Sequence, residues 1–464
     1  MPQKNLTVKE ILKVTKGELI CGAIEKEVVS YSNDTRTIEK GDLYLGIRGE
    51  KFNGSNFYKE AIKKGAIGAI IQDIQITNKD REELKDKIII KVNNVVEAIQ
   101  EMAKAKRNKY DIPIVAITGS VGKTSTKDMV ASIIEQKYNV LKTQGNLNNH
   151  IGLPLTILKL REHNFLVVEM GMNNLGEIRV LSNIAKPTAC VITNVGTSHI
   201  GNLGSRENIL KAKLEILEGM QNHGAVILNN DNDLLHNWIE QNREKYHIVT
   251  YGIENASQYI AYDIQESQTT SDFKVRVNEK EYEVTVPIPG RHFILNALCA
   301  MSVGLEYGIE MEKIKEGIAK FELTKKRMEI VNLPSDVTVI NDCYNANYDS
   351  MKAALEYLGK IQGKRRVAVL GDMLELGDYA KQLHEKIGEE VVKNKIDLLL
   401  TAGQLAKDIA GRADYVGLSK EKIHAFDNTK LLIDAIKNYI KPGDTILIKA
   451  SNAMGFDKII EAIK

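Results

Sequence analysis

A glycine-rich turn joins an apolar strand to a helix in the segment AITGSVGKTST, residues 116–126. Glycines at 119 and 122 let the backbone approach a phosphate closely, and the helix that opens at Lys123 directs free N–H groups toward it. Lys123 adds a positive charge, and the Thr124 hydroxyl is placed to bind Mg²⁺. The segment therefore predicts a nucleotide phosphate site between a strand and a helix of an α/β domain.

The match is to a short form of the P-loop pattern. The usual motif has a glycine five residues before Gly122, where this chain has Ile117. A glycine-rich turn without a ligand is the alternative, but such a turn has no use for Lys, Thr and Ser after the glycines. The predicted nucleotide contacts are Gly119, Ser120, Val121, Gly122, Lys123, Thr124 and Ser125.

The composition excludes several classes of function. With 464 residues the chain has room for about three domains. Sixty-three basic and 61 acidic side chains give a net charge of +2, which does not support nucleic-acid binding. Four scattered cysteines suit free thiols in a reducing compartment, and no run of about 20 apolar residues predicts membrane insertion. We expect a cytoplasmic protein, and a monomer, although the sequence does not fix the oligomeric state.

Three α/β units follow one another along the chain. Residues 1–110 alternate short helices and strands and predict a small α/β domain. Residues 111–326 contain the P-loop and near-continuous apolar strands, which are typical of a mostly parallel sheet covered on both faces. Residues 327–464 restart the alternation and predict a Rossmann-like, doubly wound domain. The expected fold class is α/β with three domains.

Two polar residues follow apolar strands at one edge of the predicted central sheet. Glu169 follows the strand FLVV, and His199 comes after the next strand, in TNVGTSHIG. Ligands of open α/β sheets bind at this edge, and a carboxylate after so apolar a run needs a cation, for which Mg²⁺ is the natural candidate. Taken alone, His199 could also be an ordinary loop histidine.

Lys213 lies on the apolar face of a helix predicted over residues 206–219. Ile209 and Leu217 stand four residues before and after it, whereas Lys211 points elsewhere. A lysine on such a face must reach solvent, pair with a carboxylate or lose its proton, and a neutral amine can react with CO₂ to form a metal-binding carbamate. From the residues alone, solvent exposure or pairing is the more common outcome.

Three more loops carry polar residues that suit a nucleotide or a sugar. The segment TQGNLNNHIGLP concentrates asparagines after the P-loop helix, although asparagines also form turns. NDCYNANYDSM contains Asp342, which suits ribose hydroxyls or a helix cap. GDMLELG places Asp372 and Glu375 in a loop on the ligand side of a strand.

Together these motifs resemble the Mur ligase family over essentially the whole chain. GSVGKTST is shared with all Mur ligases and with folylpolyglutamate synthetases. GNLNNHIGLPLTIL, VVEMGMN, NDCYNANYDSMKAAL and LGDMLELG are similar to the branch that adds D-alanyl-D-alanine to UDP-N-acetylmuramoyl-tripeptide. The resemblance implies an ATP- and Mg²⁺-dependent amide ligase of peptidoglycan biosynthesis with small-molecule substrates. Residues 1–110 would bind the UDP-sugar.

The resemblance also implies roles for individual residues. Catalytic residues would be Lys123, Glu169, His199 and Lys213. Magnesium would be bound by Thr124, Glu169, His199 and Lys213, the last as a CO₂-derived carbamate. Further ATP contacts would be Asn296, Arg327 and Asp342. The expected substrate contacts are Asp34, Arg36, Asn146, Asn148, Asn149, Asp372 and Glu375.

Two alternative functions belong to different classes. The first is a related Mur-type or folylpolyglutamate-type amide ligase with another acceptor, for which the NLNN and GDMLELG segments would be expected to be absent. The second is a P-loop NTPase switch, which would hydrolyse ATP when a macromolecular partner binds.

Overall fold

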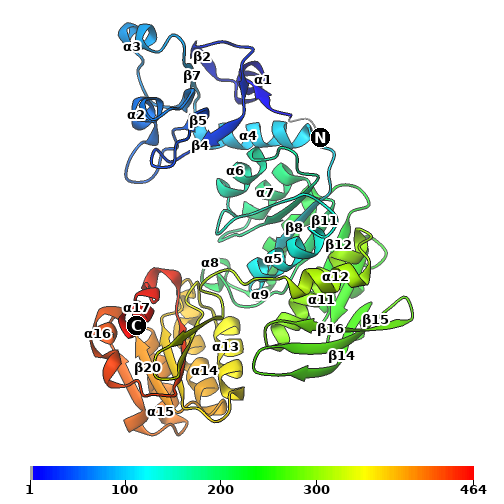
Figure 1. Ribbon diagram of the computed structural model, residues 1–464, viewed down its shortest axis with the longest axis vertical. Coiled ribbons are helices and arrows are strands. Elements are labelled where there is room, and N and C mark those ends of the chain that lie inside the picture. Colours follow the sequence, from blue (N-terminus) through cyan, green and yellow to red (C-terminus); the bar gives the residue numbers. More distant parts are fainter. Residues whose placement is uncertain (1–3) are drawn as a thin grey trace.

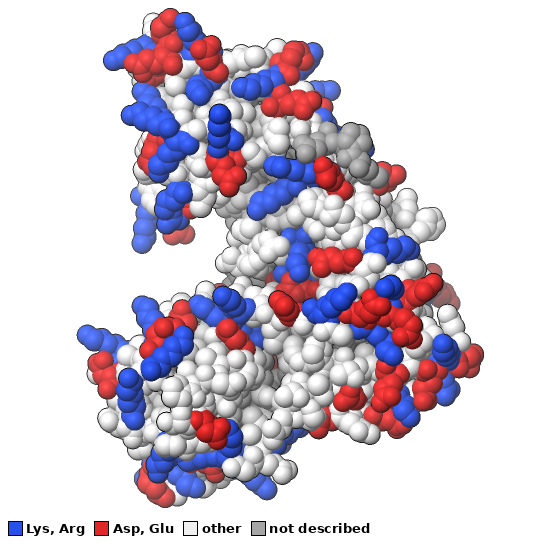
Figure 2. Space-filling view, viewed as in Figure 1, with Lys and Arg blue, Asp and Glu red and all other residues white. Residues whose placement is uncertain are grey.

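The computed structural model describes residues 4–464 as three α/β units, each built around its own sheet (Figure 1). The N-terminal unit lies above the central unit, and the C-terminal unit lies beside the lower part of the central one. Figure 2 shows an open hollow between the N-terminal and C-terminal units. The expected α/β class with three units is confirmed.

The N-terminal unit has a five-stranded sheet in the order β2-β7-β6-β5-β4, with a separate pair formed by β1 and β3. Its strands are β1 (Leu6–Thr7), β2 (Glu18–Cys21), β3 (Glu27–Val28), β4 (Ser30–Ser32), β5 (Asp42–Leu45), β6 (Gly68–Ile71) and β7 (Ile88–Lys91). Its helices are α1 (Val8–Thr15), α2 (Tyr58–Lys63), α3 (Asn78–Glu83) and α4 (Val95–Asn108). Helix α4 connects this unit to the central one, where it contacts α6 and α7.

The central unit has a nine-stranded sheet in the order β16-β15-β14-β13-β12-β11-β8-β10-β9, parallel from β9 to β14 and antiparallel in the final ribbon. Its strands are β8 (Ile114–Thr118), β9 (Val140–Lys142), β10 (Phe165–Glu169), β11 (Ala189–Ile192), β12 (Ala225–Asn229), β13 (His247–Gly252), β14 (Tyr259–Glu266), β15 (Ser271–Val277) and β16 (Lys280–Val286). Its helices are α5 (Lys123–Ile134), α6 (Gly152–Leu158), α7 (Glu177–Ala185), α8 (Ile200–Leu203), α9 (Arg206–Leu214), α10 (Asp233–Asn242), α11 (Arg291–Glu306) and α12 (Met311–Ala319). Every residue of β8, β10, β11 and β12 is buried, because helices cover both faces of the parallel part.

The C-terminal unit has a six-stranded sheet in the order β17-β18-β22-β19-β20-β21. Its strands are β17 (Glu329–Leu333), β18 (Val337–Asn341), β19 (Arg366–Gly371), β20 (Leu398–Ala402), β21 (Ile423–Phe426) and β22 (Thr445–Lys449). Its helices are α13 (Tyr348–Lys360), α14 (Ala380–Lys393), α15 (Ala406–Tyr415), α16 (Thr429–Ala435) and α17 (Asp457–Ile463). All strand pairs are parallel except β17 with β18, as a doubly wound unit with an antiparallel edge requires.

Some local expectations need correction. The helix predicted over residues 206–219 ends at Leu214, and a 3₁₀ turn continues over Glu215–Gly219. The Glu215 carboxylate turns inward there and accepts hydrogen bonds from the backbone N–H groups of Gly176 and Arg179, at 2.7 and 3.2 Å, at the start of α7.

The predicted boundaries at 110 and 326 lie between the last strand of one sheet and the first strand of the next. Between residues 4 and 464, no helix combines the length and the apolar character that crossing a membrane requires.

Candidate active site

The P-loop runs from β8 to α5 in a conformation that requires its two glycines. Gly119 has φ 155° and Gly122, the residue that caps α5, has φ 80°. A Cβ atom on Gly119 would lie 1.9 Å from Thr193 Oγ1, and one on Gly122 would lie 2.9 Å from Asn296 Oδ1. The glycines therefore allow the turn to fit against the β11 loop and α11.

Two backbone N–H groups of the P-loop are already engaged within the protein. Ser120 and Val121 donate hydrogen bonds to Asn194 Oδ1 at 3.1 and 3.0 Å. The free N–H groups at the start of α5 remain for an anion, as at any helix N-terminus. Lys123 Nζ folds back to donate to the Gly119 carbonyl at 2.8 Å. Burial lowers the pKa of Lys123, and Glu169 opposes this effect.

Glu169 lies at the carboxyl end of β10, as predicted, with an exposed fraction of 2%. Its carboxylate oxygens accept hydrogen bonds from neutral side chains, Thr124 Oγ1 at 2.9 Å and Asn148 Nδ2 at 2.7 Å. Arg327 Nη2 donates to Thr124 Oγ1 at 2.9 Å. A buried carboxylate beside a hydroxyl offers the oxygen ligands that Mg²⁺ prefers, so these residues fit a magnesium ion.

The Lys213 side chain is among the most deeply buried ionisable side chains, with an exposed fraction of 2%. It lines the same cavity as Lys123 and Glu169, and within residues 4–464 its amine has no carboxylate or hydrogen-bond partner. Burial lowers the pKa of Lys213 well below its usual value, and nearby Lys123 acts in the same direction. Burial thus disfavours the charged form of this amine, which does not extend to solvent, whereas Lys211 is exposed, as predicted.

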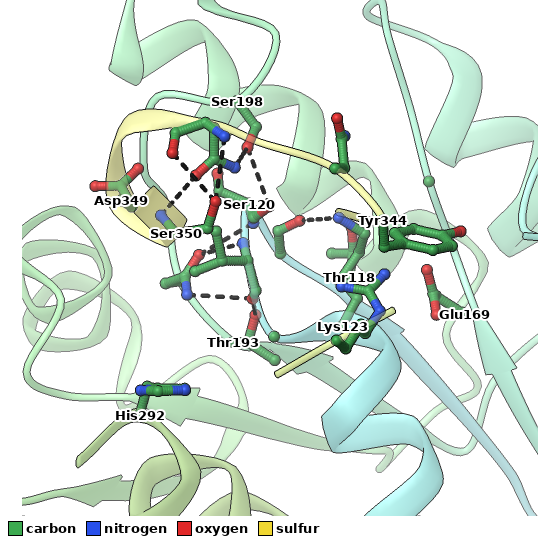
Figure 3. A pocket seen from close by; sticks show the side chains of 18 of the residues that line it. Thr118, Ser120, Lys123, Glu169, Thr193, Ser198, His292, Tyr344, Asp349 and Ser350 are labelled. Carbon is green, nitrogen blue, oxygen red and sulfur yellow. Dashed lines mark hydrogen bonds between the residues drawn. The ribbon is translucent and has the colours of Figure 1, made fainter. Parts of the chain in front are cut away.

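A cavity of about 410 Å³ opens between the central and C-terminal units (Figure 3). The P-loop, the β10 and β11 loops, α11 and the segments at 327 and 342–354 form its walls. It brings together most of the predicted residues: Gly119, Ser120, Val121, Gly122, Lys123, Asn146, Asn148, Asn149, Glu169, His199, Lys213, Asn296, Arg327 and Asp342. Thr124 and Ser125 are buried in the first turn of α5 and do not line the cavity, although Thr124 contacts Glu169 of its wall. A nucleotide site between two units is the usual arrangement for α/β sheets.

His199 contacts a residue of the other unit. Its Nδ1 lies 2.7 Å from Glu375 Oε2, and both residues have positive φ angles, 62° and 66°. The histidine lowers the pKa of Glu375. Glu375 lines a smaller neighbouring cavity of about 360 Å³, which shares His199 and Ser198 with the larger one.

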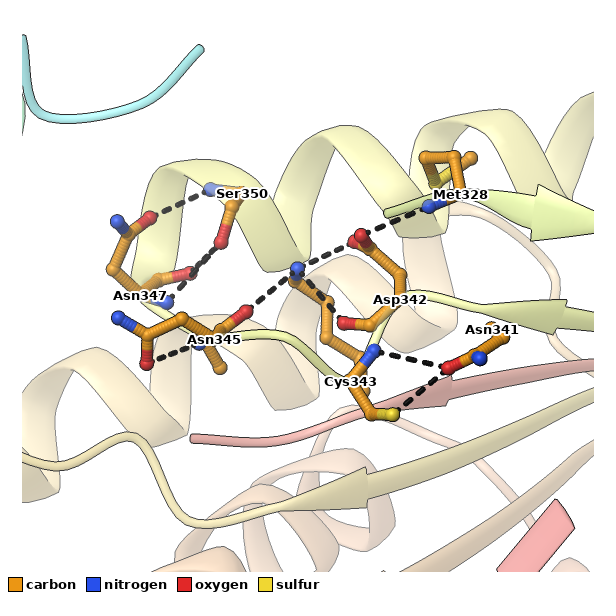
Figure 4. Close-up of polar contacts among 9 residues, drawn as sticks. Met328, Asn341, Asp342, Cys343, Asn345, Asn347 and Ser350 are labelled. Atoms are coloured by element: carbon orange, nitrogen blue, oxygen red, sulfur yellow. Dashed lines mark hydrogen bonds and ion pairs between the residues drawn. The ribbon is translucent and has the colours of Figure 1, made fainter. Parts of the chain in front are cut away.

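Asp342 is held by a network that the sequence did not indicate (Figure 4). Lys449, which is 2% exposed, donates to Asp342 Oδ2 at 2.5 Å and to the Asn345 carbonyl at 3.1 Å. Met328 N donates to Asp342 Oδ1 at 3.1 Å. The Arg327 guanidinium lies 4.0 Å from the centre of the Tyr344 ring. Asp342 therefore fixes the loop between β18 and α13 at the edge of the cavity.

The remaining predicted residues lie outside the large cavity. Asp372 accepts a hydrogen bond from Ala406 N, at 2.7 Å, at the start of α15, and it lines neither cavity. Asp34 and Arg36 form an ion pair of 2.6 Å on the N-terminal unit, where the Arg36 side chain is 84% exposed. The hydrogen bond from Arg36 lowers the pKa of Asp34 to about 2. The substrate roles of these three residues stay predictions.

Sequence reasoning missed several residues that shape the cavity. Thr193 and Asn194 hold the P-loop, and Tyr344 and Lys449 shape the C-terminal wall. Thr193 and Asn194 begin the segment TNVGTSH, which also contains the predicted site residue His199. Lys449 gave no signal, because a lysine at the end of a strand is commonly exposed.

Comparisons with known proteins cover the chain almost completely. The model described as "Mur ligase family, catalytic domain" matches residues 27–107, "Mur ligase middle domain" matches 117–304, and "Mur ligase, glutamate ligase domain" matches 326–452. The UDP-N-acetylmuramoyl-tripeptide–D-alanyl-D-alanine ligase of Bacillus subtilis is 37% identical over 98% of this chain and 97% of its own. The Escherichia coli ligase of the same name is 31% identical over 99% and 98%.

Solved structures agree with these relatives. A crystal structure of MurF from Acinetobacter baumannii has a TM-score of 0.88 at 28% identity, covering 100% of this chain and 99% of that one. MurF ligase from Thermotoga maritima in complex with ADP has a TM-score of 0.80 at 25% identity, covering 94% and 97%. The chain belongs to the Mur ligase family, and within it to the UDP-N-acetylmuramoyl-tripeptide–D-alanyl-D-alanine ligases.

Proposed function

We propose that this protein uses ATP to join D-alanyl-D-alanine to UDP-N-acetylmuramoyl-tripeptide, forming the UDP-linked pentapeptide for peptidoglycan. One observation carries the proposal: the P-loop, Glu169 and Lys213 meet in a single cavity that the C-terminal unit completes. Relatives of the same length with this activity in their name support the choice of substrates.

The reaction takes place in two steps. A carboxylate oxygen of the tripeptide attacks the γ-phosphorus of ATP, and ADP leaves, which gives an acyl phosphate. The amine of D-alanyl-D-alanine then attacks the carbonyl carbon, and the tetrahedral intermediate loses phosphate and a proton to give the amide. Activation is needed because a free carboxylate repels nucleophiles and has no good leaving group.

In the first step, different residues of the cavity contact the phosphates, the nucleoside and the metal ion. Lys123 and the N-terminus of α5 hold the β and γ phosphates, for which the lysine turns away from the Gly119 carbonyl. Asn296, from α11, contacts the adenine. Arg327, at the start of the C-terminal unit, contacts the nucleotide beside Thr124, to which its guanidinium already donates a hydrogen bond. Thr124, Glu169 and His199 would hold Mg²⁺, which would supply positive charge to the transferred phosphoryl group.

Lys213 takes part as a carbamate in this proposal. Its neutral amine attacks CO₂ and loses a proton, which replaces an unpaired buried amine with an anion. That anion would help to hold Mg²⁺ or its bound waters in place. The buried position of the amine, beside Lys123 and without a carboxylate partner in the described chain, supports this assignment.

The proposed substrate residues lie on all three units. Asp34 and Arg36 bind the UDP-sugar on the N-terminal unit, and Asn146, Asn148 and Asn149 of the central unit flank its diphosphate. Asp372 and Glu375 contact the substrate from the C-terminal unit, where Glu375 lines the smaller cavity. The cytoplasmic location and the monomeric state expected from the sequence remain predictions.

The test is ADP release by the purified protein with ATP, UDP-N-acetylmuramoyl-tripeptide and D-alanyl-D-alanine, each omitted in turn. We expect sustained release only when all three are present. Release that ignores D-alanyl-D-alanine but responds to another amino acid would favour a related amide ligase. Release triggered by a macromolecule would favour an NTPase switch.

A further inference from the structure

Asp349, which is labelled in Figure 3, lies in the first turn of α13 and contacts the central unit across the junction. Its Oδ2 atom accepts hydrogen bonds from Thr197 N at 2.9 Å and from Thr197 Oγ1 at 3.1 Å. Thr197 belongs to the loop between β11 and α8, which also carries Asn194 and His199. A carboxylate of one unit thus holds a backbone segment of the other.

The same loop is bonded directly to the P-loop. Asn347 donates to Ser198 Oγ at 2.5 Å, and Ser198 Oγ donates to the Ser120 carbonyl at 3.0 Å. Gly196 N donates to Ser120 Oγ at 2.9 Å. Hydrogen bonds therefore run without a break from α13 to the phosphate turn.

Gly196 allows this approach for a steric reason. A Cβ atom on Gly196 would lie 2.2 Å from Asp349 Oδ2. Because that atom ends a flexible side chain, an added methyl group would displace the carboxylate rather than the backbone. A substitution either at Asp349 or at Gly196 should therefore remove the contact between Asp349 and Thr197.

We propose that Asp349 is a positioning residue for the nucleotide site: it docks the C-terminal unit onto the 194–199 loop and so holds the P-loop and His199 in place. Only the expected effect of Asp349 on turnover rests on the proposed function; its effect on nucleotide binding does not. Asp349 acts through Thr197, since its own carboxylate is occupied by that residue. Nucleotide affinity thereby depends on a contact between two units.

The experiment compares Asp349→Ala with Asp349→Asn and with Glu356→Ala, which removes an outer carboxylate of the same helix. ADP affinity is measured by equilibrium titration, and kcat and KM by ADP release. We expect Asp349→Ala to weaken ADP binding by about tenfold, the loss typical of a hydrogen bond to a charged group. Asp349→Asn keeps an acceptor oxygen and restores most of the affinity. Glu356→Ala behaves as the unmodified protein.

A second variant separates docking from a general effect on folding. Gly196→Ala should reproduce the loss with Asp349 present, and the double variant with Asp349→Ala should be no weaker than either single one. Unchanged ADP affinity in both single variants, or losses that add in the double variant, would overturn the proposal. ADP titration needs no turnover, so this result stands whether or not the ligation assay succeeds.

Discussion

The two ends of the proposed reaction lie in contrasting surroundings. Glu169, Lys213 and Lys449 are almost completely buried around the nucleotide cavity, and two units contribute its walls. Asp34 and Arg36 form an exposed pair on the N-terminal unit alone. Buried polar groups are held in position before the ligand arrives, whereas an exposed ion pair must exchange its partner for the substrate. Changes in the cavity should therefore affect kcat, and changes at the exposed pair should affect KM.

The shape of the molecule adds to this contrast. The C-terminal unit is docked on the central one through His199 with Glu375 and through Thr197 with Asp349. The N-terminal unit stands apart from the C-terminal unit across the hollow in Figure 2. A substrate that spans the hollow has to bring its carboxylate to the P-loop, and closure of such units commonly precedes chemistry.

The largest effect is expected for Lys123→Ala. The variant removes the charge beside the transferred phosphoryl group, so kcat should fall by roughly a hundredfold or more, as for removal of one preorganised electrostatic donor. The melting temperature should stay close to that of the unmodified protein, because the side chain contacts its own loop. Turnover near the normal rate would contradict the phosphate site.

Lys213→Ala is expected to lower kcat by about 10–100-fold, the usual loss when a group that supports a metal site is removed. Acetate or formate should restore part of the activity, because a small carboxylate can fill the vacated space with the missing charge. Lys211→Ala is the matched control and should stay active, since that side chain is exposed. Full activity of Lys213→Ala without any added anion would contradict the carbamate.

Arg36→Ala should act on binding alone. We expect KM for the UDP-sugar peptide to rise about tenfold, as for loss of a hydrogen bond between charged groups, while KM for ATP and kcat change little. The measurement is initial ADP release with each substrate varied in turn. Equal effects on both KM values would break the division between the exposed face and the cavity.

The smallest effect concerns the pH dependence of stability. Burial lowers the pKa of His292, at the cavity, to about 4, whereas an unfolded histidine titrates near pH ~6.5. In that interval the unfolded chain binds a proton that the folded chain does not, so stability falls as pH drops from about 6.5 to 4. His292→Asn should remove about 1 kcal/mol of this fall, measured by urea unfolding at pH 7 and 5.5.

Asp34→Asn serves as the control on the exposed face. Its carboxyl titrates near pH 2 in the folded protein and near pH ~3.9 in the unfolded chain, both below the two measured pH values, so the variant should show the same fall in stability as the unmodified protein. An equal fall in the His292→Asn variant would show that the buried histidine does not contribute.

The sequence predicted the features that depend on local patterns. Buried parallel strands are visible in the sequence as apolar runs, and the P-loop is a contiguous motif. The α/β units and the role of residues 119–125 could therefore be predicted. The interactions that hold the site in place were not. Asn194 contacts Ser120, which is 74 residues away in the sequence, and Asp349 contacts Thr197, which is 152 residues away. Hydrophobic periodicity gives no information about contacts between residues so far apart in the sequence. The inward turn of Glu215 was missed because a helical pattern does not reveal a 3₁₀ end.

The central claim is that the carboxylate of the tripeptide is activated as an acyl phosphate in the cavity between the two units. UDP-N-acetylmuramoyl-tripeptide labelled with ¹⁸O in its terminal carboxylate tests it directly, with the released phosphate analysed by mass spectrometry. Because the oxygen that attacks ATP leaves with the phosphate, each turnover should give phosphate that carries one ¹⁸O atom. Unlabelled phosphate formed together with the amide product would contradict the mechanism.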